Sequence, residues 1–336
     1  MSMDDAAGFV RRRQQPLARV AAGFLWLVLS VAFAQAETSY PNRPVRIITP
    51  YGPGGIADVT MRTVAQKLSE RLGQQFIVDN RPGAGGIVAA KAAAGAAPDG
   101  YTLFQIGNGS TVAKSLFKSL PFDVQRDFTP ISLTALFDLV LATKSGSRLR
   151  TVQDIITTAR AQPGKLNFGA IAAGSTQNLS AELFRLTANI DVAIVAYRTT
   201  PELLTALLRG DVDVGFDYYP GFSAPLADHR LVAIATTGER PMLSLPDIPT
   251  VHDSGLPPYI VTGWNALSGP AGMPEPVIAL LNREINAVLA LPDVQARTLQ
   301  FGMDAHGTTP QELAERMQRD IDKWAAVIEK AGIEKQ

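Results

Sequence analysis

The sequence predicts an α/β protein with two lobes, each built on a mainly parallel sheet flanked by helices. Three observations favour this fold: the length of 336 residues, the hydrophobic fraction of 46%, and an order in which short apolar strands alternate with amphipathic helices. A chain of this length exceeds what one hydrophobic core usually organises. The alternation indicates parallel strands joined by right-handed crossovers.

The first part of this pattern predicts three strands, at residues 45–50, 76–78 and 102–106. A glycine turn after the first strand leads into a helix expected over residues 58–72, which Gly73 closes. A second glycine turn leads into an alanine-rich helix that ends near Pro98. Each strand is thus followed by a turn rich in glycine, at the edge of the predicted sheet.

The alternation restarts after residues 139–143, which we predict to cross from one lobe to the other. Strands are then expected at 165–169, 192–195, 212–216 and 231–236, and helices at 151–161, 179–187 and 201–209. A return crossing near 260–267 precedes helices at 276–290 and 310–331. We therefore predict lobe one from residues 40–141 and 263–336, lobe two from residues 142–262, and a two-strand hinge between them.

The N-terminal 36 residues have the pattern of an export signal. Four arginines precede an apolar run at residues 20–34, and Ala34-Gln35-Ala36 offers a signal-peptidase site. The apolar run is shorter than the roughly 20 residues of a spanning helix. We expect cleavage after Ala36 and a periplasmic location.

Charge and cysteine content exclude several classes of function. The signal segment carries four of the 31 basic and two of the 31 acidic residues, which leaves 27 and 29 in the mature chain. A near-neutral surface lacks the basic footprint of nucleic-acid binding and of attachment to anionic lipid. Without cysteine, thiolate catalysis, disulfides and cysteine-based metal sites are also excluded.

Four segments follow predicted strands where a parallel sheet binds its ligands, namely residues 51–58, 107–111, 174–178 and 216–220. The first and third are glycine-rich or hydroxyl-bearing and open a helix, whose N–H groups favour an anion. Alternatively, the glycines only form turns, and Asp58 and Thr176 only cap helices. The candidate ligand-binding residues are Tyr51, Gly54, Gly55, Ile56, Ala57, Asp58, Asn108, Ser110, Gly174, Ser175, Thr176, Asn178 and Asp217. Tyr218 and Tyr219 either line the crevice or pack between the lobes.

The strongest alternative is a dinucleotide-binding oxidoreductase. Residues 52–57 fit the pattern G-x-G-x-x-G/A after a strand, and Asp79 ends the second strand, where an acid would bind ribose. The export signal argues against this alternative, and the second lobe shows no acid–base pair. There is also no G-x-S-x-G motif, no phosphate-binding loop and no metal-spaced cluster of His, Asp and Glu. We therefore expect no catalytic residues, cofactor or metal.

Several motifs occur together in a specific order along the mature chain. They are Tyr40-Pro41-Asn42-Arg43-Pro44, Pro53-Gly54-Gly55 with Asp58, residues 79–86 (DNRPGAGG), residues 98–103 (PDGYTL), Phe216-Asp217, residues 245–251 (LPDIPTV) and residues 269–272 (GPAG). With these motifs the chain resembles the substrate-binding proteins of tripartite tricarboxylate transporters, the Bug-type binding proteins. The resemblance covers essentially the whole mature chain.

The resemblance implies a periplasmic binding-protein fold that closes on a small carboxylate and delivers it to integral-membrane transporter subunits, or that acts as a ligand sensor. It places the carboxylate between residues 51–58 and 174–178, on backbone amides, hydroxyls and ordered waters. The chain departs from the family pattern at Ile56-Ala57, where the family usually has Gly-Thr or Gly-Ser, and at Gln177-Asn178, where it usually has Gln-His. The identity of the ligand therefore cannot be transferred from the family to this chain. We also expect a monomer.

Overall fold

The computed structural model describes residues 40–336, apart from the side chains of Ile56 and Ala84. All the elements below lie within one compact unit, residues 43–336. The predicted signal segment lies outside the described residues. Within residues 40–336, no helix combines the length and the apolar character that crossing a membrane requires.

Five strands form the first group, in the order β2-β1-β3-β9-β4. Strand β1 (Val45–Thr49) pairs in parallel with β2 (Phe76–Asn80) and β3 (Thr102–Gly107). Strand β9 (Thr262–Pro270) runs antiparallel to both β3 and β4 (Phe128–Lys144). The helical elements of this group are α2 (Ile56–Leu72), η2 (Ala84–Gly86), α3 (Ile87–Ala94), α4 (Asn108–Leu116), α9 (Glu275–Leu289), α10 (Pro292–Leu299) and α11 (Pro310–Ala331).

The second group has its own parallel strands, β7 (Val214–Tyr218), β5 (Asn167–Ile171) and β6 (Ala193–Tyr197). The far end of β4 runs antiparallel to β7 and to β8 (Leu231–Thr236). The helices of this group are α5 (Val152–Ala161), α6 (Thr176–Ala188), α7 (Thr200–Arg209) and α8 (Tyr219–Ala227). Local signals predicted these elements well: Thr151 forms a capping box with Asp154 at α5, and Gly73 ends α2 in the left-handed conformation.

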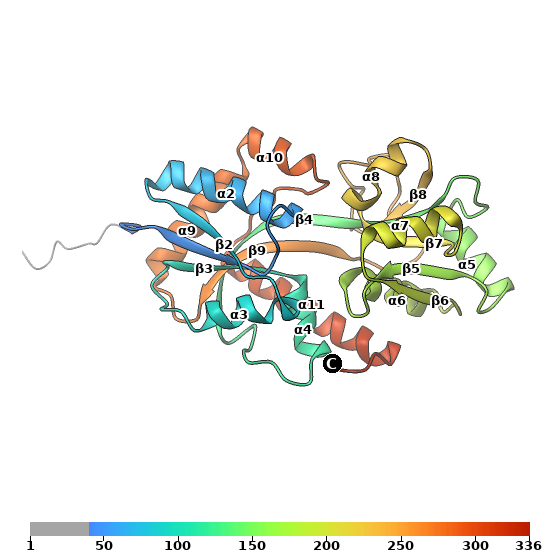
Figure 1. Ribbon diagram of the computed structural model, residues 1–336, viewed down its shortest axis with the longest axis horizontal. Helices are drawn as coiled ribbons and strands as arrows, with labels where there is room; N and C mark the ends of the chain where they lie inside the picture. The colour runs from blue at the N-terminus through green and yellow to red at the C-terminus, as the bar shows by residue number, and fades with distance from the viewer. Residues whose placement is uncertain (1–39) are drawn as a thin grey trace, which may run out of the picture. The chain divides into compact units, whose positions relative to one another are not determined.

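Strands β4 and β9 run between the two groups, as Figure 1 shows. The predicted crossing at residues 139–143 was too short, because β4 extends over 17 residues, Phe128–Lys144. Polar residues and Pro130 interrupt the apolar pattern in its first half, but pairing with β9 holds that half extended. The return crossing near 260–267 is confirmed as β9.

The predicted loop at residues 107–111 is also wrong. Gly107 ends β3 by pairing with Asn265, and Asn108 begins helix α4. Asn and Gly are weak helix formers, so sequence favoured a loop. The helix forms because its apolar residues, Val112 and Leu116 among them, are buried in a hydrophobic cluster.

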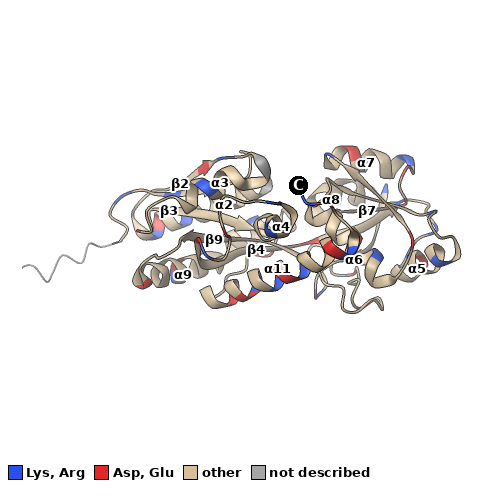
Figure 2. Cartoon of the chain, turned by 90° about the horizontal axis from the view of Figure 1, so that it is seen from below, with Lys and Arg blue, Asp and Glu red and all other residues tan. Residues whose placement is uncertain are grey.

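Helix α11 contributes to the cores of both groups. Leu313, Met317 and Ile321 pack in the cluster under the first sheet, whereas Trp324 and Val327 pack in the cluster that contains the strands of the second. Its two ends thus contact different groups, and the assignment of residues 263–336 to lobe one alone stays a prediction. Both basic and acidic residues occur along α11 (Figure 2).

Candidate functional site

The first loop, residues 51–58, connects β1 to α2. Gly54 has φ +80°, a conformation that glycine adopts without strain. Gly55 takes the N-cap position of α2 and has no side chain to cap it. The N–H groups of the first helical turn therefore have no intrahelical partner, and they carry the positive end of the helix dipole. Ile56 and Ala57, predicted to precede the helix, form part of this turn.

Asp58 organises the first loop from inside. Its side chain is 2% exposed and accepts hydrogen bonds from the Gly54 amide at 2.9 Å, Asn80 Nδ2 at 2.7 Å and Arg62 Nε at 3.0 Å. Burial alone would raise the pKa of this carboxyl, but the three hydrogen bonds and the Arg62 charge outweigh burial and lower the pKa. Asp58 is therefore ionised and both of its oxygens have donors, which makes it a support of the loop.

The second loop lies between β5 and α6 and begins at Ala172. Ser175 is the N-cap residue of α6, and its Oγ accepts from the Asn178 amide at 3.2 Å and donates to the Ile171 carbonyl at 2.9 Å. Asn178 Oδ1 accepts from the Gly174 amide at 3.1 Å. The cap is therefore Ser175 and not Thr176, and Asn178 lies in the first turn of the helix. The side chains of Ser175 and Asn178 are thus already hydrogen-bonded within the loop. This agrees with the alternative interpretation, in which the polar residues of this loop only cap the helix.

Tyr218 lies near both loops. Its hydroxyl is hydrogen-bonded to Thr176, and it lies close enough to Tyr51 for an electrostatic interaction. Tyr51 in turn donates to Asn265 Oδ1 at 3.3 Å. Burial raises the pKa of Tyr51 to about 12 and also raises the pKa of Tyr218. Both hydroxyls therefore keep their protons at neutral pH and stay hydrogen-bond donors.

Asp217 is buried at the end of β7, with three donors around its carboxylate. Thr200 Oγ1 donates at 2.6 Å, Gln177 Nε2 at 3.1 Å and the Tyr218 amide at 2.8 Å. Burial raises the pKa of Asp217 against the opposing effect of these bonds. The carboxylate thus ties β7 to the first turns of α6 and α7, and it offers a ligand no free oxygen without rearrangement.

Asn108 and Ser110 lie in the first turn of α4. The buried Asn108 side chain accepts from the Trp264 amide at 2.6 Å and donates to Asp320 Oδ2 at 3.2 Å. Asp320 also accepts from Trp264 Nε1 at 2.6 Å. This network joins α4 to β9 and α11, so we treat Asn108 as a positioning residue. Ser110 is half-buried and its side chain is not part of this network.

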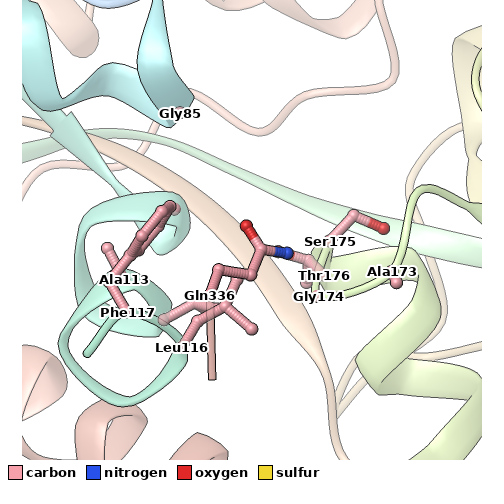
Figure 3. Close-up of a pocket in the computed structure, with 11 residues that line it drawn as sticks. Gly85, Ala113, Leu116, Phe117, Ala173, Gly174, Ser175, Thr176 and Gln336 are labelled. Carbon is pink, nitrogen blue, oxygen red and sulfur yellow. The ribbon is translucent and has the colours of Figure 1, made fainter. Parts of the chain in front are cut away.

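A pocket of about 400 Å³ lies between α4 and the second loop. Figure 3 shows Leu116 and Phe117 on one side, the Gly174–Thr176 backbone on the other, and the Gln336 side chain between them. A Cβ atom at Gly174 would lie 2.6 Å from Leu116 Cδ2, and φ there is +81°. Only glycine fits this close approach of the loop to α4.

Comparison with known proteins decides the family. A family model described as the tripartite tricarboxylate transporter family receptor matches residues 60–333. The chain belongs to this family. It is similar to BugT of Bordetella pertussis, with 31% identity over 92% of this chain and 96% of the relative. The predicted resemblance to tripartite transporter receptors of the Bug type is thereby confirmed.

Two solved structures resemble this receptor closely. One, Rpa4515 from R. palustris, was determined with adipate and shows 30% identity and a TM-score of 0.74 over 87% of this chain and 98% of its own. The other, MatC from Rhodopseudomonas palustris, has bound malate, with 29% identity and a TM-score of 0.70 over 86% and 100% of the two chains. The predicted α/β binding-protein fold is confirmed, with a mixed sheet in which the crossing strands are antiparallel.

Sequence analysis missed some residues that support the receptor's two loops. Gln177 and Thr200 bond Asp217, and Asn80 bonds both Asp58 and the Tyr51 carbonyl. The signal for Asn80 was its place at the end of the second strand, beside the first loop. Thr200, in contrast, begins α7 and lies 17 residues before Asp217, and no local pattern pairs the two.

The arrangement suits binding of an anion by neutral groups. Helices α2 and α6 both begin at these loops, where the first-turn N–H groups carry the positive end of the helix dipole, and the acids Asp58 and Asp217 already have donors. Asp79, the predicted ribose-binding acid of the alternative, is ion-paired with Arg81 at 2.9 Å. Among residues 40–336, no cluster of three or more His, Asp or Glu side chains is placed to hold a metal ion.

Proposed function

We propose that this receptor captures a small carboxylate between the first and second loops and delivers it to the membrane subunits of a tripartite transporter. The observation that carries the proposal is the convergence at Tyr218 of two helix-opening loops from different strand groups. Each loop supplies unpaired backbone N–H groups at a helix N-terminus, which favour negative charge. The carboxylates present in the two related structures, adipate and malate, agree with this chemistry.

In this proposal the lobes are residues 40–141 with 263–336, and residues 142–262, and they close about β4 and β9. Tyr51, Gly55, Ile56, Ala57, Ser110, Gly174 and Thr176 line the ligand site with their backbone or hydroxyl groups. Gly54, Asp58, Asn108, Ser175, Asn178 and Asp217 hold that lining in place. The protein acts as a monomeric binding protein without catalysis, and the same site would suit a ligand sensor.

A thermal-shift screen tests the proposed function. Adipate, malate and succinate are the probes, with adipamide as the uncharged analogue of adipate and NADH for the oxidoreductase alternative. A ligand at 100 times its dissociation constant adds about 2.7 kcal/mol, which for a chain of this length raises the melting temperature by roughly 5 °C. We expect at least one carboxylate to do so and adipamide not to. A shift with NADH alone would contradict the proposal.

We further propose that export removes residues 1–36, so that the mature protein begins at Glu37. The basic stretch, the apolar run and the Ala-x-Ala site support this. Intact-mass measurement of the protein released by osmotic shock from an expressing Gram-negative cell is expected to give the mass of residues 37–336. A mass that includes residues 20–34 would overturn both the cleavage and the free periplasmic form.

A further inference from the structure

A second pocket, of about 490 Å³, lies beside the two crossing strands and is separate from the proposed ligand site. Its lining includes Asp138 of β4 and Thr262 of β9, which pair directly. Phe137 pairs with Gly263, and Asn265 lies two residues further along β9. Since strand side chains alternate between faces, Asp138 and Thr262 lie on the opposite face from Asn265, the residue that Tyr51 contacts. We call this the back pocket.

Two oppositely charged side chains in the back pocket each have an atom without a hydrogen-bond partner. Arg316 of α11 is within 4.0 Å of no carboxylate oxygen among the described residues, and its Nε has no hydrogen-bond partner there. Asp138 accepts a hydrogen bond from the Thr262 side chain, but its Oδ1 is buried without a partner. Burial raises the pKa of Asp138 to about 6 and lowers the pKa of Arg316. A buried atom of a charged group that lacks a hydrogen bond is costly, so a molecule that bonds both atoms would be stabilised.

The lining of the back pocket is mixed, with polar residues such as Glu239 and His306, and its apolar part comes from two distant parts of the chain. Met242 and Leu243 lie in the segment after β8, and Leu299 and Met303 lie at and after the end of α10. Leu243 is 65% exposed and Leu299 is 39% exposed. A volume of this size is in the range of small-molecule sites, which combine apolar walls with a few polar groups.

We propose that the back pocket binds a compact amphoteric molecule, an α-amino acid with an apolar side chain. Arg316 would hold the carboxylate through its planar guanidinium, Asp138 would accept from the ammonium group, and the hydrocarbon side chain would cover Leu243 and Leu299. The site differs from the proposed ligand site because it offers unpartnered atoms of a cation and of a carboxylate, whereas the two loops offer neutral donors.

The back pocket is also coupled to closure of the lobes, and this part rests on the proposed function. When the lobes close over the proposed ligand site, they turn about β4 and β9, and this movement separates the walls of the back pocket on the opposite face. A molecule that bridges α11 and the segment after β8 opposes this movement, because it binds the open form better than the closed one. Because coupling between two sites is reciprocal, a molecule in the back pocket then weakens binding of the carboxylate in the proposed ligand site.

L-Leucine is the probe, and isothermal titration at millimolar concentrations is the measurement. Arg316→Met removes the cation and keeps an unbranched apolar stem. Arg319→Met, whose side chain is 67% exposed and outside the pocket, is the matched control. We expect leucine to bind the wild-type protein and Arg319→Met equally, and to bind Arg316→Met at least about 10-fold more weakly. Leucinamide and isocaproate, which lack one charged group each, should bind the wild-type protein more weakly than leucine.

A second variant and a front-site variant complete the test. Leu243→Glu changes an exposed residue, so it should fold normally while its carboxylate repels that of leucine. Ser175→Glu, designed to abolish front-site binding, should leave leucine binding unchanged. Loss of leucine binding in Ser175→Glu with retention in Arg316→Met would overturn the back site but leave the proposed function intact. No binding of leucine to the wild-type protein would also overturn it. Unchanged carboxylate affinity at saturating leucine would overturn the coupling.

Discussion

Ser175→Glu is expected to weaken carboxylate binding by two to three orders of magnitude. The substitution puts a fixed negative charge at the N-cap of α6, where the first-turn N–H groups would hold the ligand. At an effective dielectric near 20, two unit charges about 4 Å apart repel by roughly 4 kcal/mol, and about 1.4 kcal/mol corresponds to a tenfold change. Titration of the carboxylate that gives the largest thermal shift measures the effect.

The structure adds a stability cost to this substitution. Ser175 caps α6 and bonds the Ile171 carbonyl, and loss of an N-cap hydroxyl costs about 1 kcal/mol. Ser175→Gln is the matched control, because it has the size of Glu, loses the same hydroxyl and carries no charge. We expect Ser175→Gln to lose the same stability as Ser175→Glu but to keep most of its affinity for the carboxylate. Equal affinities of the Glu and Gln variants would show that the ligand carboxylate does not lie at this helix end.

Asp58→Ala is expected to reduce the free energy of unfolding by about 3 kcal/mol and to weaken ligand binding at least about tenfold. The substitution leaves the Gly54 amide, Asn80 Nδ2 and Arg62 Nε without their common acceptor. Breaking a buried charged network typically costs 3–5 kcal/mol, and we take the lower end because Arg62 is half-exposed. Binding weakens because the first loop loses the bonds that fix it.

Urea unfolding at pH 7 and near pH 3 measures the stability effect and its pH dependence. The folded pKa of Asp58 is below its ordinary value, so its contribution is present above about pH 4 and is lost as the pH falls through the folded pKa. The wild type and Asp58→Ala should therefore become more alike in acid. Glu70→Ala, an exposed acid of the same helix that pairs with Lys67 at 3.5 Å, is the control and should cost under about 0.5 kcal/mol. An equal cost for the two variants at pH 7 would contradict the role of Asp58.

The two departures from the family pattern have different structural consequences. Asn178, at the position where the family usually has His, uses its Oδ1 to accept from the Gly174 amide, so it helps to hold the second loop. Ala57, in the first turn of α2, accepts a hydrogen bond from Gln105 at its carbonyl and has no hydroxyl to offer a ligand. We therefore expect the first loop to bind through its backbone more than through side chains.

Sequence by itself determined most of the elements and the order in which they occur. Local signals sufficed where the decisive interaction is local, as with the capping box of Thr151 and Asp154 or the glycine that ends α2. The family motifs determined the relationship to tripartite transporter receptors, because their order along the chain is specific. The first and third predicted loops also open helices, as expected from their glycines and hydroxyls.

Only the tertiary structure decided which polar residues are free to meet a ligand. Asn108, Ser175 and Asp217 follow strands and therefore suited a site, but Trp264, Ile171 and Thr200 occupy their side chains. Two of these partners, Trp264 and Thr200, are distant in sequence, and a hydrogen bond over such a separation leaves no local pattern. The extent of β4 and the helical state of α4 depend in the same way on pairing with β9 and burial of Leu116. Packing between distant segments thus overrides weak local preferences, and it places Arg316 beside Asp138 where sequence shows only a charged helix and a strand.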